Sequence, residues 1–103
     1  MSVIKVHGTA DGMLFQGELW IESFDVDGVA VLPFSRVNAD GSVTINCAFG
    51  GVIELTRDRS RAMHFDGTAE AMRAWNTVSA TRPRRPDGLP NKPLTALTVE
   101  VGP

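Results

Sequence analysis

Arginine is the residue type whose spacing in this chain points most directly to chemistry. The segment Arg57-Asp58-Arg59-Ser60-Arg61 places an arginine at every second position. If the segment is extended, Arg57, Arg59 and Arg61 lie on one face at intervals of about 7 Å, comparable to the spacing of phosphates along a nucleic-acid strand. The pattern is more typical of a solvated connection between two strands, and the alternative is a patch that binds nucleic acid.

A second basic segment, residues 82–93, holds four of the six prolines and adds Arg82, Arg84 and Arg85. A loop of about a dozen residues is long for a small domain, and long loops are often functional. Prolines reduce the entropy lost when a loop docks, and arginine pairs bidentately with carboxylates. We therefore predict a protein-binding loop. The alternatives are a second part of the nucleic-acid patch and an ordered crossover to a final strand.

Aromatic residues that face solvent would add a stacking or docking surface to either patch. In the stretch 13–24, alternation places Phe15, Leu19 and Ile21 on one face, and Trp20 on the other face with two glutamates. Trp20 is therefore predicted to be exposed and to contact a partner.

Other reactive side chains are too scattered to form a catalytic or metal site. His7, Cys47 and His64 are far apart in sequence, and Cys47 lies on the apolar face of a predicted strand, where a thiol is unreactive. Asp25-Val26-Asp27-Gly28 resembles a fragment of a calcium loop but lacks the further oxygen ligands. We expect no metal, no cofactor and no enzymatic activity.

Five Asp-Gly dipeptides, at positions 11, 27, 40, 66 and 87, indicate how these residues are positioned. Asp-Gly between alternating apolar runs is typical of hairpin turns, because Asp bonds its downstream backbone and Gly adopts positive φ. The first three dipeptides bound predicted strands, and the fourth precedes a predicted helix. The dipeptide Asp87-Gly88 has no alternating run on either side.

Apolar alternation predicts six or seven short strands. The first is expected to be a weak edge strand, Gly17 suggests a bulge or a close approach of another backbone, and Pro33 marks a bent or edge strand. The predicted ranges are 3–7, 13–24, 29–37, 42–49, 52–57, 62–65 and 94–101.

A single helix is predicted over about residues 68–80, with Thr68 as its N-cap. Met72 and Trp75 recur on one face, and Pro83 follows the helix. A helix of this length must pack on the sheet to persist. The fold class is therefore α+β, a curled antiparallel meander with one helix, and the alternative is an all-β barrel with a peripheral helix.

Composition is that of one globular domain over residues 1–103, with a net charge of −2 and one cysteine. Residues 1–56 carry two basic and seven acidic side chains, whereas residues 57–103 carry eight basic and five acidic. No apolar run is long enough to span a membrane, so we expect a cytoplasmic protein. Unpaired sheet edges suggest a homodimer.

The function predicted from these features is that of a non-enzymatic protein-binding module, such as an inhibitor or accessory factor, acting through Arg82, Arg84, Arg85 and Trp20. The alternative is a nucleic-acid-binding β-domain that uses Arg57, Arg59 and Arg61.

Overall fold

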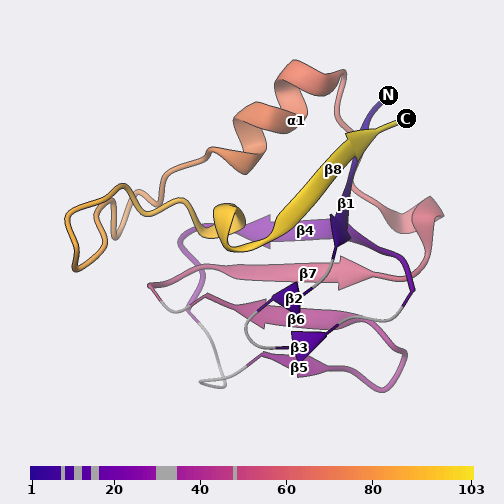
Figure 1. Cartoon of the computed structure of the whole chain (residues 1–103), viewed down its shortest axis with the longest axis horizontal. Helices are drawn as coiled ribbons and strands as arrows, with labels where there is room; N and C mark the ends of the chain where they lie inside the picture. Colours follow the sequence, from indigo (N-terminus) through magenta and orange to yellow (C-terminus); the bar gives the residue numbers. More distant parts are fainter. Residues whose placement is uncertain (8, 11–12, 15–16, 30–34, 48) are drawn as a thin grey trace.

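The chain folds into an open antiparallel sheet with one α-helix beside it (Figure 1). The computed structural model describes residues 1–7, 9–10, 13–14, 17–29, 35–47 and 49–103. Within these residues the sheet has six strands in the order β5-β6-β7-β4-β1-β8, and β2 and β3 form a separate two-stranded hairpin. The α+β prediction is confirmed. The barrel alternative is wrong, because β5 and β8 stand at opposite ends of an open sheet.

The elements are short and mostly match the predicted apolar runs. The sheet strands are β1 (Val3–His7), β4 (Leu19–Asp25), β5 (Arg36–Val37), β6 (Val43–Asn46), β7 (Val52–Thr56) and β8 (Thr98–Gly102). The small hairpin consists of β2 (Thr9–Ala10) and β3 (Met13–Leu14). The helices are α1 (Thr68–Trp75) and two 3-10 turns, η1 (Arg59–Arg61) and η2 (Pro93–Ala96).

The Asp-Gly dipeptides act as turns where the structure describes them. Asp40-Gly41 joins β5 to β6, with Gly41 at φ +86° and the Asp40 carboxylate accepting from the backbone and hydroxyl of Ser42. Asp27-Gly28 follows β4 in a turn closed by Gly28 N donating to Asp25 O. Gly67 is the N-cap of α1, one residue before the predicted cap. Asp11-Gly12 lies outside the described residues.

The first strand is not an edge strand, contrary to the prediction. β1 pairs with β4 on one side and with β8 on the other, and Val3, Ile4 and Val6 are buried. Lys5 had suggested an edge, but its amine is paired with Glu18 at 2.8 Å on the surface of the sheet. One charged side chain on an outer face is therefore compatible with a central strand.

The predicted strand over residues 13–24 is divided in two. The chain turns at Gly17, which has φ +80°, and β4 begins only at Leu19. The register shift in β4 lies between Ile21 and Ser23 rather than at Gly17. The predicted core positions Leu19 and Ile21 are both fully buried, while Phe15 lies outside the described residues.

Several other predicted strand ranges also differ from the observed ones. Residues 62–65 form no strand and contribute one bridge between Ser2 and Phe65. Of the predicted strand 29–37, residues 30–34 lie outside the described part, and β5 covers Arg36–Val37. The last strand begins at Thr98, because Pro93 starts the 3-10 turn η2, where its missing N–H costs nothing.

The helix is also shorter than predicted, ending at Trp75 instead of near residue 80. Asn76 Nδ2 donates to Met72 O and Thr77 Oγ1 donates to Arg73 O. The Thr77 hydroxyl thus bonds the Arg73 carbonyl that a helical Thr77 N–H would otherwise reach, whereas Met72 O also accepts from Asn76 N. Side-chain donors therefore help to close the last turn of the helix.

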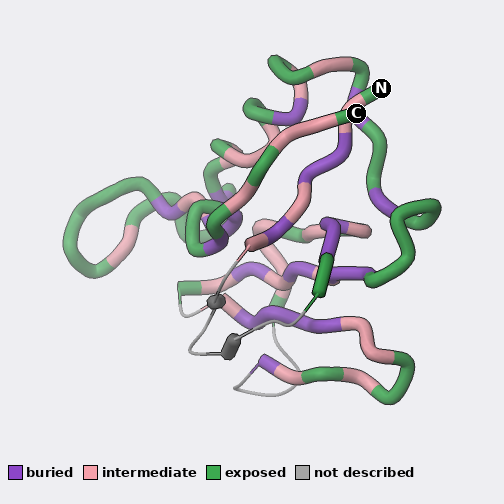
Figure 2. The backbone as a smooth tube through the Cα atoms, turned by 45° about the vertical axis from the view of Figure 1, so that its right-hand side comes forward, coloured by how far each residue is buried: buried purple, intermediate pink, exposed green. Residues whose placement is uncertain are grey.

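Apolar side chains pack on both faces of the sheet, in a large cluster on one face and a small cluster on the other. The larger cluster joins strand residues such as Ile4, Ile21 and Ile53 to Ala71 of α1 and Leu94 of η2. On the other face Val3, Trp20 and Ala62 form a small second cluster. Figure 2 shows buried stretches along the central strands and mostly exposed residues in the loop at the left.

Candidate protein-binding arm

Residues 82–93, called the arm below, extend away from the sheet between α1 and η2 (Figure 1, left). The arm folds back on itself as a small hairpin. Arg85 N donates to Leu89 O at 2.8 Å, Asn91 N donates to Pro83 O at 3.0 Å, and Arg84 forms a bridge with Pro90. The arm is therefore a structured projection, built largely from its own hydrogen bonds.

The tip of the arm is the fifth Asp-Gly turn. Gly88 N donates to Arg85 O, and Gly88 has φ +85°, which makes Pro86-Asp87-Gly88 a three-residue hairpin loop. Proline sets the φ of the first loop position, and the Asp87 carboxylate accepts from Leu89 N. The turn that lacked alternating strands is thus the tip of a hairpin formed by proline-rich segments.

Asp27 attaches the base of the arm to the turn after β4. Its Oδ1 accepts from Ser79 Oγ at 2.8 Å, from Thr81 N at 2.9 Å and from Thr81 Oγ1 at 3.0 Å. The Thr81 backbone N–H and the Ser79 hydroxyl hold the pKa of Asp27 below its ordinary value. A carboxylate that receives three donors fixes the direction in which the chain enters the arm.

Asn91 secures the other side of the base. Its amide donates to Phe49 O at 3.0 Å, and its backbone carbonyl accepts from Ser79 N at 2.9 Å. Asn91 and Ser79 are both buried. Both ends of the arm are therefore held by polar contacts with the turns at one end of the sheet.

The three arginines of the arm have different surroundings. Arg85 lies over the Phe49 ring, 5.0 Å from its centroid, and pairs with Asp87 at 2.8 Å. Arg84 Nη1 donates to Gly88 O at 3.0 Å. The Arg82 side chain runs past Gly50, and Arg82 is exposed like Arg84. Arg85 thus stabilises the arm, while Arg82 and Arg84 present their charge to solvent.

Apolar residues are exposed at the tip and near the base of the arm. Leu89 is 55% exposed, and Phe49 and Val29 are also exposed. The sequence interpretation missed Leu89 and Phe49. The signal that could have found Leu89 was its place directly after a Pro-Asp-Gly turn.

Trp20, the predicted exposed aromatic, is buried. Its exposed fraction is 7%, and it packs with Val3 and Ala62 on the face of the sheet opposite the main core. Alternation assigned Trp20 to the outer face correctly. The segment after η1 then folds over that face and covers it, so Trp20 is removed from the candidate contacts.

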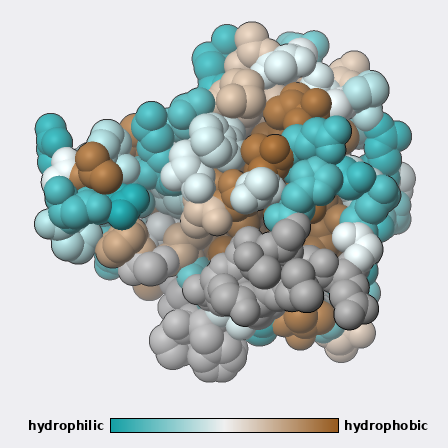
Figure 3. All heavy atoms as spheres, in the orientation of Figure 1, coloured by the Kyte–Doolittle hydropathy of each residue, from teal (hydrophilic) through white to brown (hydrophobic). Residues whose placement is uncertain are grey.

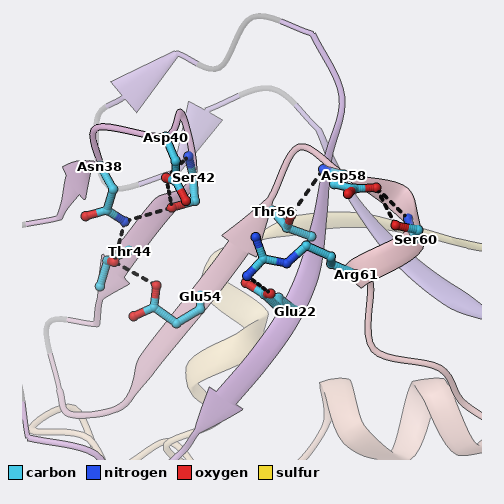
Figure 4. A network of polar contacts seen from close by, with 10 residues as sticks. All are labelled: Glu22, Asn38, Asp40, Ser42, Thr44, Glu54, Thr56, Asp58, Ser60 and Arg61. Carbon is cyan, nitrogen blue, oxygen red and sulfur yellow. Dashed lines mark hydrogen bonds and ion pairs between the residues drawn. The ribbon is translucent and has the colours of Figure 1, made fainter.

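The other arginine cluster is not extended. Residues 59–61 form η1, begun by Asp58, whose carboxylate accepts from the backbone and hydroxyl of Ser60. Arg61 reaches back to Glu22 of β4 at 2.7 Å, as Figure 4 shows. Arg57 Nε donates to Gly41 O at 2.8 Å. The one-sided row of Arg57, Arg59 and Arg61 is therefore absent.

The two arginine clusters also do not form one surface. Arg57 follows the last residue of β7, whereas Arg82 lies beside Gly50, which precedes the first residue of β7. A five-residue strand separates these ends by about 17 Å. The prediction that the arm could extend the patch around Arg59 is wrong.

The remaining reactive groups occupy separate places. His7 Nε2 lies 2.7 Å from Glu100 Oε2, His64 is exposed, and the half-buried Cys47 thiol donates to Pro93 O at 3.7 Å. Among the described residues no group of three or more His, Cys, Asp or Glu side chains is placed to hold a metal ion. In the same residues no helix has the length and apolar character needed to cross a bilayer.

Neither a protein-family model, nor a curated protein sequence, nor a solved structure matches the chain.

Proposed function

We propose that this protein is a non-enzymatic protein-binding module, an inhibitor or accessory factor whose main contact is the arm. The observation that carries the proposal is the hairpin over residues 83–91, which projects from the sheet with Leu89 exposed at its tip. Its backbone hydrogen bonds and its attachment to Asp27 exist before any partner binds. A preformed loop loses little conformational entropy on docking, so more of the contact energy appears as affinity.

The chemistry of the arm indicates what the partner must offer. An exposed leucine fits an apolar pocket, and the exposed guanidinium groups of Arg82 and Arg84 favour carboxylates at the rim of that pocket. Phe49 and Val29 add apolar surface near the base of the arm. The partner surface we infer is a hydrophobic pocket with an acidic edge. We place this interaction in the cytoplasm, where the single thiol stays reduced.

Affinity capture from the source cell, with nuclease present, tests the proposal. Leu89→Asp should remove the captured protein, because burying a carboxylate in an apolar pocket should weaken binding by about thirtyfold or more. Val37→Asp, at an exposed site on β5, is the matched control and should retain it. A captured protein that binds the wild type and Leu89→Asp equally would exclude the arm as the contact.

Substitutions of Arg84 then test how much its positive charge contributes to capture of the partner. Arg84→Ala should weaken capture, while Arg84→Lys should restore part of it because the positive charge remains. Arg85→Ala is unsuitable as a binding test, because Arg85 also packs on Phe49.

Salt dependence distinguishes this proposal from the nucleic-acid alternative. Binding through several phosphates weakens steeply with salt, whereas docking of an apolar tip depends on salt only weakly. Fluorescence polarisation with labelled single- and double-stranded DNA measures the first case. Tight, steeply salt-dependent DNA binding that is lost in Arg59→Ala but unchanged in Leu89→Asp would favour the alternative.

A further inference from the structure

β8 is an edge strand of the sheet. Its five residues follow β1 in continuous register from Val3–Gly102 to His7–Thr98, and no described strand lies on its other side. Natural edge strands often carry charged residues, Pro or a bulge that limits pairing with another chain. β8 has the sequence Thr-Val-Glu-Val-Gly, with no Lys, Pro or terminal bulge, and Glu100 is its one charged residue.

An apolar groove runs along β8, on the side that faces α1. The groove measures about 520 Å³ and is lined mainly by Met72, Trp75, Leu97, Val99 and Val101. Met72 is exposed, and Trp75, Val99 and Val101 are half-buried at the border of the core. Figure 3 shows hydrophobic residues gathered over β8 and next to α1. An apolar strip thus lies beside unpaired backbone.

Trp75, which lines the groove, also has an unsatisfied donor. Its Nε1 is buried and has no acceptor among the residues that the structure describes. Buried indole N–H groups usually find a partner, so the packing of Trp75 at this margin of the sheet is incomplete.

We propose that β8 pairs antiparallel with β8 of a second copy of this chain, about a two-fold axis at Val99, to form one continuous sheet. The axis stands perpendicular to the sheet, so both copies present Met72 and Trp75 on the same face. Each helix then covers the apolar strip from its own side. The two grooves become one interface, consistent with the isologous contacts of two-fold dimers.

The residues of β8 select the register. Side chains on opposed antiparallel strands share a face, so the axis must pass through a residue. An axis at Glu100 would place two carboxylates directly opposite each other, which is unfavourable. An axis at Val101 would bring Pro103, which has no N–H, into the ladder. An axis at Val99 avoids both problems, because it pairs Thr98 with Glu100 of the second copy and Leu97 with Val101 of the second copy.

The same self-complementarity favours a second copy over an unrelated strand. Each β8 offers one hydroxyl and one carboxylate on its outer face and valines on its inner face, and the Val99 axis matches each to a suitable counterpart. Stable interfaces bury about 800 Å² per partner, whereas a five-residue strand with one groove offers only a small contact. We therefore expect a dimer that dissociates at micromolar concentration.

Sedimentation velocity on the full chain, from about 1 to 200 µM, measures the dimer Kd. Substitutions of Thr98, which is expected to lie opposite Glu100 of the second copy, test the proposed register. Thr98 is exposed, so its substitution should not disturb the monomer. Thr98→Glu places a carboxylate opposite Glu100 of the second copy and should raise the dimer Kd about tenfold, because the contact occurs twice. Thr98→Lys should lower the Kd a few-fold. Thr98→Glu with Glu100→Lys should restore it to within about threefold of the wild type, and Glu100→Lys alone controls for the lost contact between Glu100 and His7.

Val37→Lys on the opposite edge is the control and should leave the Kd unchanged, and thermal melts confirm that each variant is folded. A wild-type monomer at about 200 µM overturns the proposal. Thr98→Glu and Thr98→Lys variants that shift the Kd equally, or not at all, overturn the pairing of β8 about Val99. The arm is unchanged in all these variants, so their outcome is independent of the proposed partner contact.

Discussion

The two arginine-rich segments lie beyond opposite ends of β7 and use their side chains in opposite ways. Around η1, Arg57 donates to a carbonyl of the β5–β6 turn and Arg61 pairs with Glu22 on β4. In the arm, Arg84 and Arg85 bond to Gly88 and Asp87 of their own hairpin, and Arg85 also lies over Phe49. The first segment is attached to the sheet through its arginines, and the second is attached through Asp27 and Asn91 at its base.

The difference shows that arginine content does not decide whether a segment is a binding surface. Near η1, carbonyl and carboxylate oxygens of neighbouring strands are within reach, so the guanidinium groups stabilise the fold. In the arm, the Pro-Asp-Gly turn bonds its own backbone and carries the chain away from the sheet. The arm's arginines bond within their own hairpin, and Arg82 and Arg84 remain exposed, so their charge is accessible to a partner.

The largest expected effect is at the junction between the arm and the sheet. Gly51 has φ +108°, and a Cβ there would lie 2.8 Å from Cβ and Cγ of Pro93, which ends the arm. Gly51→Ala should therefore lower the free energy of unfolding by about 2–4 kcal/mol, through backbone strain and a clash with a rigid ring. Urea denaturation measures this loss.

Gly67→Ala is the matched control, because Gly67 has an extended backbone and open space around it. It should cost under about 1 kcal/mol. Equal losses in the two variants would contradict the close packing of the arm against the β6–β7 turn.

Substitution of Gly88 at the tip of the arm should cost less stability than Gly51→Ala, and its structural effect should stay within the arm. Gly88 has φ +85° with no atom near its missing Cβ, so Gly88→Ala should cost about 1–2 kcal/mol from backbone strain alone. Gly88→Asn should cost less, since Asn tolerates this conformation. Chemical denaturation gives the stabilities, and amide NMR shows where the change occurs. Shifts that extended to η1 would contradict an independently structured arm.

Removing one arginine from each segment compares the η1 region with the arm directly. Arg61→Ala should cost about 0.2–1 kcal/mol, because it removes an ion pair with the partly exposed Glu22. Arg84→Ala should stay within about 0.5 kcal/mol of the wild type, as expected for an exposed side chain. A double-mutant cycle with Glu22→Gln isolates the pair energy. A larger loss of stability for Arg84→Ala than for Arg61→Ala would contradict the conclusion that the arginine near η1 contributes more to the fold than Arg84 does.

Acidic pH should destabilise the base of the arm and the start of η1, and this is the smallest of the expected effects. The pKa of Asp27 is lowered mainly by the Thr81 backbone N–H, and that of Asp58 mainly by the Ser60 hydroxyl, from an ordinary value of 3.8. The stabilisation from each carboxylate is therefore present above that value and is lost as the pH falls through the lower folded pKa. Amide NMR of Thr81 and Ser60 should report the two losses separately. Asp27→Asn should abolish the acid response at Thr81 only.

Much of the fold was predictable because its signals are local. Alternation identified Leu19 and Ile21 as core residues, and Asp40-Gly41 and Asp66-Gly67 marked a hairpin and a helix start. The ends of the elements were less predictable. Asn76 and Thr77 close the helix through side-chain bonds, and Pro93 begins a 3-10 turn where a strand was expected.

The candidate site was only partly predictable. The proline- and arginine-rich segment was identified, but Leu89 and the attachment through Asp27 were not. Ser79 and Thr81 lie more than fifty residues from Asp27, so no local pattern connects them to it.

The sequence alone determined where the chain turns, which strand faces are apolar and where the basic charge lies, because these depend on neighbouring residues. Only the tertiary structure decided that β1 is central, that Trp20 is covered and that the arginine clusters lie apart. It also decided that β8 is an open edge beside an apolar groove. These properties depend on which distant segments meet, and packing and pairing between them are set by the whole fold.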